Sequence, residues 1–120
     1  MEIRKKVFGL DNLNVADSYF NIGLVYYHFD KYDAALEYYN KAMRIMEKAP
    51  KTDLAALHVS FANVYLEKGE FETALEHYQI ALDIWEPILG SEHNHIIRIK
   101  DKIAEAQAKI IEKENNDGNE

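Results

Sequence analysis

The spacing of apolar residues predicts that this chain is built from helices. Large apolar side chains recur at Val15, Tyr19, Ile22 and Tyr26, three or four positions apart. This spacing places them on one face of an α-helix, which completes a turn in about 3.6 residues. We therefore expect a helix over residues 14–29.

The same pattern returns 39 positions later, which indicates an internal repeat. Residues 14–48 align without a gap with residues 53–87, so that Gly23 falls on Ala62. A period of 20–50 residues is typical of stacked supersecondary units. Further matched pairs are Tyr26 with Tyr65, Tyr32 with Phe71, Ala35 with Ala74, Leu36 with Leu75, Tyr39 with Tyr78, Ala42 with Ala81, and Ile45 with Ile84.

Each unit is predicted to hold two helices joined by a tight turn. The turns fall at residues 30–31 and 68–70, where Gly69 can adopt a left-handed backbone without steric cost. Residues 48–51 separate the two units, and Pro50 suits a linker because proline is unfavourable in a helix interior. Pro87 is expected to kink the second unit's outer helix or to end it early.

Both ends of the chain look like parts of further units. Residues 2–9 resemble residues 83–90, the end of the second unit. This similarity predicts that residues 2–8 are helical and belong to a preceding unit. It also predicts that Ile3, Val7 and Phe8 face the helix over residues 14–29.

The last unit is incomplete. Residues 93–114 are expected to form one capping helix, followed by a disordered polar tail over residues 115–120. The apolar positions of the capping helix span an arc of roughly 200° around the helix axis. Packing on one neighbouring helix needs a stripe of only about 100°. The arc has one side at Ile96, Ile99, Ile103, Ala106 and Ile110, and a second side at Ile97, Ala104, Ala108 and Ile111.

The two full units, residues 14–48 and 53–87, resemble the tetratricopeptide repeat, a helix-turn-helix unit of about 34 residues. The small residue between its helices matches Gly23 and Ala62, and the aromatic one turn later matches Tyr26 and Tyr65. The linker over residues 89–94 is similar to that of the kinesin-light-chain type, with an asparagine in place of its proline. The resemblance implies an all-α, right-handed α-solenoid of antiparallel helix hairpins. We expect a repeat domain over residues 1–114, with residues 1–9 ending a preceding repeat, full repeats at 14–50 and 53–90, and the cap at 93–114.

Composition narrows the functional class. The chain of 120 residues has a net charge of −7, which disfavours nucleic acid as a partner, because its binding needs clustered Lys and Arg. It has no Cys and no apolar run near the roughly 20 residues that cross a bilayer. We expect a cytoplasmic protein with no membrane partner.

Catalytic and metal-binding motifs give no convincing site, so we predict no enzyme activity, no cofactor and no metal. The sequence contains no Gly-rich phosphate loop, no Gly-x-Ser-x-Gly and no Cys nucleophile. His93 and His95 could converge on a metal, but a linker histidine and a helix start explain them better. His28, His58 and His77 are interpreted as isolated surface or packing residues. Trp85 is either a packing residue, the interpretation we favour, or an exposed interface anchor.

The resemblance implies a concave groove lined by the first helix of each unit. Chaperone-tail binding is disfavoured, because the carboxylate clamp of that kind needs Lys and Asn where this chain has Phe20 and Leu24. A partner peptide or helix with hydrophobic anchors fits better. The implied groove residues are Asp17, Phe20, Asn21, Leu24, Tyr27, His28, Val59, Asn63, Leu66, Glu67, Arg98 and Lys102.

Two functions follow from these observations. The first is a non-catalytic scaffold or adaptor that binds a protein or peptide in the groove. The second is self-assembly into a dimer or head-to-tail oligomer through terminal helices, because large exposed apolar stripes usually mark interfaces. Its candidate interface residues are Ile3, Phe8, Ile97 and Ile111.

Overall fold

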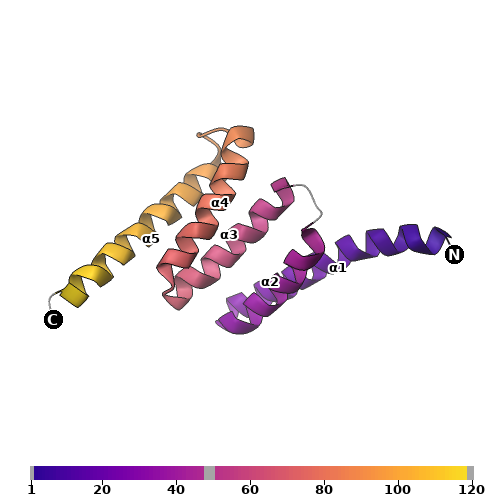
Figure 1. Cartoon of the computed structure of the whole chain (residues 1–120), viewed down its shortest axis with the longest axis horizontal. Helices are drawn as coiled ribbons and strands as arrows, with labels where there is room; N and C mark the ends of the chain where they lie inside the picture. Colours follow the sequence, from indigo (N-terminus) through magenta and orange to yellow (C-terminus); the bar gives the residue numbers. More distant parts are fainter. Residues whose placement is uncertain (1, 48–50, 119–120) are drawn as a thin grey trace. The chain divides into compact units, whose positions relative to one another are not determined.

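The regular structure of the described chain is entirely α-helical, as the apolar spacing predicted. The computed structural model describes the backbone of residues 2–47 and 51–118 and the side chains of residues 15–47 and 53–116. In chain order the helices are α1 (Glu2–His28), α2 (Tyr32–Met46), α3 (Lys51–Lys68), α4 (Phe71–Leu89) and α5 (Asn94–Gly118) (Figure 1).

The helices divide into two compact units, and each is described by itself. The first unit comprises Met1–Leu57 and the second His58–Glu120. The first therefore holds the α1–α2 hairpin, and the second holds most of α3 together with α4 and α5.

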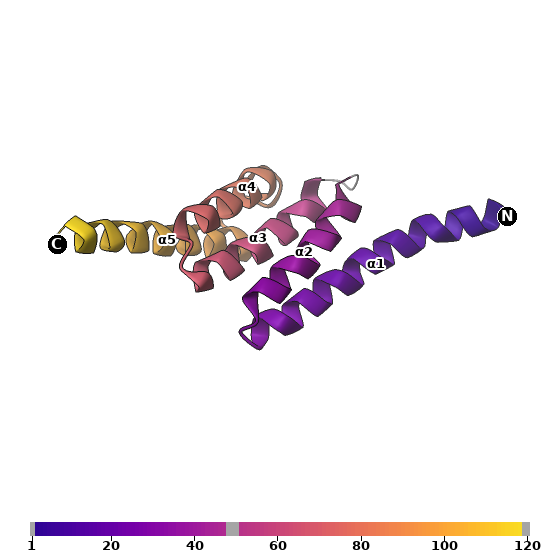
Figure 2. The same cartoon turned by 60° about the horizontal axis from the view of Figure 1, so that its bottom comes forward.

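In the first unit α1 and α2 run antiparallel and side by side (Figures 1 and 2). The contact face of α2 alternates small and aromatic residues at Ala35, Tyr39 and Ala42, all at most 1% exposed. Gly23 on α1 lets the Tyr39 ring approach the backbone, since a Cβ built there would lie 2.5 Å from Tyr39 Cε1. This close approach of a small residue and an aromatic ring helps to hold the hairpin together.

The turns of the two hairpins have the same backbone structure, which supports the predicted repeat. Asp30 and Gly69 occupy equivalent positions and have φ angles of 63° and 85°. The next backbone N–H donates a hydrogen bond to the carbonyl oxygen of Tyr26 in the first turn and of Tyr65 in the second, each 2.9 Å long. Both turns therefore satisfy the free carbonyl groups of a helix end in the same way.

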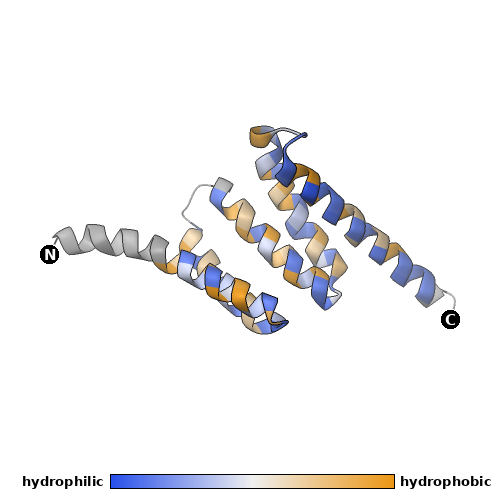
Figure 3. Ribbon diagram, turned by 180° about the vertical axis from the view of Figure 1, so that it is seen from behind, coloured by the Kyte–Doolittle hydropathy of each residue, from blue (hydrophilic) through white to orange (hydrophobic). Residues whose placement is uncertain are grey.

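In the second unit α4 packs against α3 on one side and α5 on the other. Ala74, Tyr78 and Ala81 are completely buried on α4, as their first-unit counterparts are on α2. The Tyr78 hydroxyl donates a hydrogen bond to the side-chain oxygen of Asn63 on α3. The buried stripe of α5 consists of Ile96, Ile99, Ile103 and Ala106. The hydropathy colouring shows apolar and polar positions interspersed along this helix (Figure 3).

Three helix boundaries differ from those expected. The predicted break over residues 9–13 is absent, because α1 is continuous from Glu2 to His28. Residues 2–8 are helical as expected, but in a continuous helix they cannot fold back on residues 14–29 of the same helix. A glycine inside a helix costs only about 1 kcal/mol relative to alanine, and no proline interrupts α1. The side chains of Ile3, Val7 and Phe8 lie outside the described residues.

The other two differences concern helix ends. α5 extends to Gly118, so residues 115–118 are helical rather than part of a disordered tail. Pro87 lies inside α4, which continues to Leu89 before Gly90 ends it with a φ of 91°. A proline this close to the end removes one backbone hydrogen bond, and the Gly90 N–H still donates to the Glu86 carbonyl oxygen at 2.9 Å.

Candidate interaction surface

The six predicted groove residues of the first unit all lie on α1. Asp17, Asn21 and His28 are exposed, whereas Phe20, Leu24 and Tyr27 are half-buried. Their spacing of three or four positions places them along one side of the helix. Phe20 also contacts α2, with its ring centroid 5.6 Å from that of Tyr39. This side of α1 therefore offers polar groups beside partly covered apolar ones.

The second-unit groove residues have more varied surroundings. On α3, Glu67 is exposed and Val59 is half-buried, but Leu66 is only 7% exposed. The expectation that Leu66 is an exposed groove residue is wrong, because this position belongs to the packed side of α3. Asn63 is half-buried, and its side-chain oxygen accepts the Tyr78 hydrogen bond, so it stabilises the α3–α4 hairpin.

On α5 the two predicted basic residues are accessible. Arg98 is exposed, and Lys102 lies 3.7 Å from the Glu105 carboxylate one turn further along the helix. Such an exposed pair contributes at most about 0.5 kcal/mol, so Lys102 can exchange this carboxylate for another at little cost. Both basic side chains are therefore accessible at the surface of α5.

A second surface of α1 was not predicted from the sequence. Ile22, Val25, Tyr26 and Phe29 line an open hollow of about 490 Å³ together with Lys31 from the turn. Val25 and Phe29 are 53% and 71% exposed, which is high for large apolar side chains. We call this surface the α1 hollow. The spacing of Val15, Ile22, Val25 and Phe29 signals it, but in the sequence that spacing is indistinguishable from a buried face.

The predicted second apolar side of α5 is exposed. Ile97 is 46% exposed and Ile111 is 58% exposed, while the first side packs against α4. The wide apolar arc therefore divides as expected into a buried stripe and an accessible one. Of the four candidate interface residues, Ile97 and Ile111 are accessible, and Ile3 and Phe8 lie outside the described side chains.

His58 and His77 are not isolated, contrary to the sequence-based interpretation. Their Nδ1 atoms lie 3.0 Å apart and share a hydrogen bond between α3 and α4. The His77 ring also stacks on Phe61 and Tyr65, with centroid distances of 5.2 and 5.6 Å. We call these four residues the histidine cluster. Sequence reasoning missed it because the two histidines are 19 positions apart and meet only when the hairpin forms.

Burial changes the acidity of this cluster. It lowers the pKa of His58 below the ordinary value of 6.5. Burial, and then the charge of His58, lowers the pKa of His77 to about 4. Both rings are consequently neutral at pH 7.

The equivalent cluster of the first unit contains tyrosines. Tyr19 and Tyr38 occupy the positions of His58 and His77, and their ring centroids lie 6.0 Å apart. Tyr38 also stacks on Tyr26 at 5.5 Å, and the Lys41 ammonium lies 4.9 Å from the Tyr38 ring centroid. The two repeats thus build the same aromatic contact from groups with different acid–base chemistry.

Trp85, His93 and His95 lie at the junction of α4 and α5. Trp85 is half-buried and its ring lies 5.6 Å from that of His95, so it packs rather than standing free. The His95 backbone N–H donates to His93 Nδ1 at 3.1 Å, which gives His93 a role at the start of α5. In the part of the chain that the structure describes, no three His, Cys, Asp or Glu side chains converge as a metal would require.

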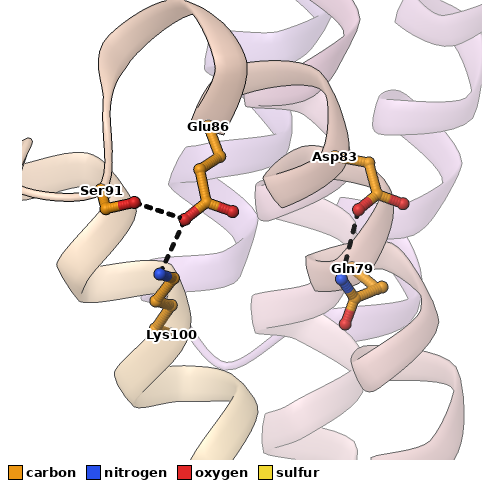
Figure 4. Close-up of polar contacts among 5 residues, drawn as sticks. All are labelled: Gln79, Asp83, Glu86, Ser91 and Lys100. Carbon is orange, nitrogen blue, oxygen red and sulfur yellow. Dashed lines mark hydrogen bonds and ion pairs between the residues drawn. The ribbon is translucent and has the colours of Figure 1, made fainter.

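A charged contact also joins these two helices. The Lys100 ammonium lies 2.7 Å from Glu86 Oε2, and the Ser91 hydroxyl donates to the same oxygen at 2.9 Å (Figure 4). The bond from Lys100, followed by that from Ser91, lowers the pKa of the Glu86 carboxyl. These contacts fix the loop between α4 and α5 at the surface.

Membrane insertion finds no support in the described helices, none of which combines the length and apolar character of a spanning segment.

Comparison with known proteins agrees with the repeat pattern. A family model described as tetratricopeptide repeat matches residues 1–48 and 53–110. The chain is also similar to "Clustered mitochondria protein homolog" proteins. It is 30% identical to that of Emericella nidulans and 29% to that of Aspergillus niger, over 96 residues in each case. These alignments cover 78% of this chain and 8% of each relative.

The family match explains the geometry described above. The small-residue and aromatic contacts of both hairpins, the equivalent turns and the 39-residue offset are the structural signature of this repeat. Proteins built from it fold as α-solenoids and generally mediate protein–protein interaction. The predicted fold class and the kinesin-light-chain-type similarity are both consistent with this match. The chain belongs to the tetratricopeptide repeat family.

Proposed function

We propose that this chain is a non-catalytic, cytoplasmic scaffold that binds a partner peptide or helix along α1, with full repeats over residues 14–50 and 53–90. The observation that carries the proposal is the accessible side of α1, where Asp17, Asn21 and His28 alternate with Phe20, Leu24 and Tyr27. Exposed polar groups supply hydrogen bonds, and half-buried rings supply apolar contact without unfolding the hairpin. This combination is typical of surfaces that recognise peptides.

The charge of the molecule indicates what the partner carries. With a net charge of −7 the chain repels acidic proteins in general. Arg98 and Lys102 provide a local basic site on α5, and Asp17 and Glu67 provide acidic ones on α1 and α3. We infer a partner segment with hydrophobic anchors and charges of both signs. The much greater length of the curated relatives leaves room for such segments within a larger protein.

A selection experiment tests this proposal. A displayed library of random 16-residue peptides is selected on the whole chain, and the affinity of recovered peptides is measured by fluorescence anisotropy. The Asp17→Lys, Asn21→Arg double variant should weaken their binding at least tenfold, about 1.4 kcal/mol, because it changes charge and size on the accessible side. The matched control is Asn40→Ala, Arg44→Ala on exposed positions of α2, which should bind as the unchanged chain does. Equal binding by the α1 variant would show that the groove proposal is wrong.

Self-assembly is the second candidate, and the exposed apolar residues favour it. The α1 hollow presents Val25 and Phe29, and α5 presents Ile97 and Ile111. An apolar surface on one copy and another elsewhere on a second copy would make a head-to-tail contact, which forms rings or open filaments.

A further inference from the structure

The histidine cluster has a chemical requirement that its tyrosine counterpart lacks. A hydrogen bond between two Nδ1 atoms needs a hydrogen on one nitrogen and a lone pair on the other. The His58–His77 bond of 3.0 Å is therefore compatible with two neutral rings or with one cationic ring. When both rings are cationic, both nitrogens carry hydrogen, the bond cannot form, and two positive charges face each other.

The packing of the cluster makes the doubly cationic state costly. His77 stacks on His58, Phe61 and Tyr65, with interplanar angles of 28°, 19° and 10° respectively. These three rings follow one side of α3 at spacings of three and four, so a single α4 side chain meets three successive contacts. A charged His77 would lose much of its hydration in this site, which is why burial lowers its pKa. Opening the hairpin relieves both costs.

We propose that the His58–His77 pair is an acid-sensitive latch that keeps the α3–α4 hairpin closed at neutral pH and releases it in acid. The latch acts on the second unit alone. In the first unit the equivalent residues are Tyr19 and Tyr38, whose phenol groups have no basic ring nitrogen and so do not become cationic in acid.

The direction of the effect follows from the titration of the pair. The pKa of His77 falls from 6.5 when exposed to about 4 in the folded hairpin. A lowered folded pKa means that the unfolded chain binds more protons between these values, so stability is complete above about pH 6.5 and is lost as pH falls toward 4. Burial and the His58 charge are the only causes of the shift, and no carboxylate from the described parts of α3 or α4 contributes to it.

Hydrogen exchange at two pH values tests the latch. Protection factors of amides in α4 are measured on the whole chain at pH 7 and pH 5, after correction for the intrinsic exchange rate at each pH. They should fall roughly tenfold for α4 relative to α2. A pKa of about 4 for folded His77 against 6.5 when exposed would give about 20-fold between these two pH values, and the partial exposure of the rings reduces this value.

The first repeat supplies a matched variant. His58→Tyr with His77→Tyr reproduces the tyrosine pair of the first unit, and it should remove the difference between the two pH values. His28→Gln, which changes an exposed histidine in the first unit, should leave the difference in place. If α4 loses protection equally in the double tyrosine variant, the latch is refuted.

A second measurement avoids any dependence on the folding of that variant. The ring resonances of His58 and His77 in the unchanged chain are followed by NMR between pH 8 and pH 4. The latch requires that both rings titrate below the ordinary histidine midpoint of about 6.5. Two ordinary titrations with midpoints near 6.5 would overturn it, whether or not the variant folds.

Discussion

At the residue scale, Gly23 has room for a hydrogen atom and for nothing larger. A Cβ there would lie 2.5 and 2.6 Å from two carbons of the Tyr39 ring and 3.2 Å from the Ala35 carbonyl oxygen. Tyr39 is 1% exposed, so its ring is covered by neighbouring atoms and cannot swing out into solvent without opening the hairpin. The equivalent residue of the second repeat is Ala62 on α3, which is also small and is fully buried.

We predict that Gly23→Ala destabilises the first unit by about 1–2 kcal/mol, measured by urea unfolding. Alanine is the better helix former by about 1 kcal/mol, but overpacking of a rigid core costs about 1–3 kcal/mol and prevails. Combining Gly23→Ala with Tyr39→Leu, which vacates the ring volume, should give less destabilisation than the two separate changes added together. Stabilisation by Gly23→Ala alone would mean that the ring can move aside.

Asn63 shows how far one residue can be interpreted from sequence. Its place in the repeat suggested a groove residue, because positions between the signature residues usually point outward. In the structure, its side-chain oxygen instead accepts a hydrogen bond from the Tyr78 hydroxyl. Tyr78 is completely buried, and the repeat spacing that aligns it with Tyr39 says nothing about where its hydroxyl finds an acceptor.

At the scale of elements, the two hairpin turns adopt the same left-handed backbone conformation with different residues. Asp30 and Gly69 both have positive φ, a conformation that costs most residues about 1–2 kcal/mol and glycine almost nothing. Aspartate tolerates it better than most residues, and the Tyr32 hydroxyl donates to Asp30 Oδ1 at 3.0 Å. The turn between α1 and α2 is therefore held partly by a side chain.

We predict that Gly69→Ala destabilises the second unit by about 1 kcal/mol in thermal unfolding. The added methyl group meets no neighbouring atom within 4 Å, so the cost is purely one of backbone conformation. Gly69→Asp, which copies the first turn, should cost less than Gly69→Ala. Equal costs for the two variants would show that this aspartate preference does not operate here.

Helices and turns were largely accessible to sequence reasoning, whereas their ends were not. Apolar periodicity and the 39-residue repeat indicated α2, α3 and α4 because both signals depend on residue type alone. Gly9 suggested a break and Gly90 a stop, yet only Gly90 ends a helix. A glycine permits either outcome: Leu10 follows Gly9 and α1 continues, whereas Ser91 follows Gly90, which ends α4 with a φ of 91°.

At the scale of the whole molecule, exposed apolar surface remains on each unit. We predict concentration-dependent association, detected by light scattering at tens of micromolar. Val25→Glu with Phe29→Glu, or Ile97→Glu with Ile111→Glu, should shift the chain toward monomer, because each pair charges one exposed apolar surface.

The matched control for this association replaces Asn40 and Arg44, which are exposed and polar, by glutamate. It should associate as the unchanged chain does. A clean monomer at these concentrations, unaffected by any of the three double variants, would remove the support for self-assembly and leave the scaffold function as the sole proposal.

The aromatic residues are unevenly divided between the units, and this division has an optical consequence. The only tryptophan, Trp85, lies on α4 against His95, while six of the eight tyrosines belong to the first unit. Light absorbed by indole alone therefore excites the second unit without the first. Indole emission would follow the separation of α4 from α5, while circular dichroism would follow helices of both units. The chain thus carries a built-in fluorophore with which loss of one repeat can be told from loss of the other, without any label.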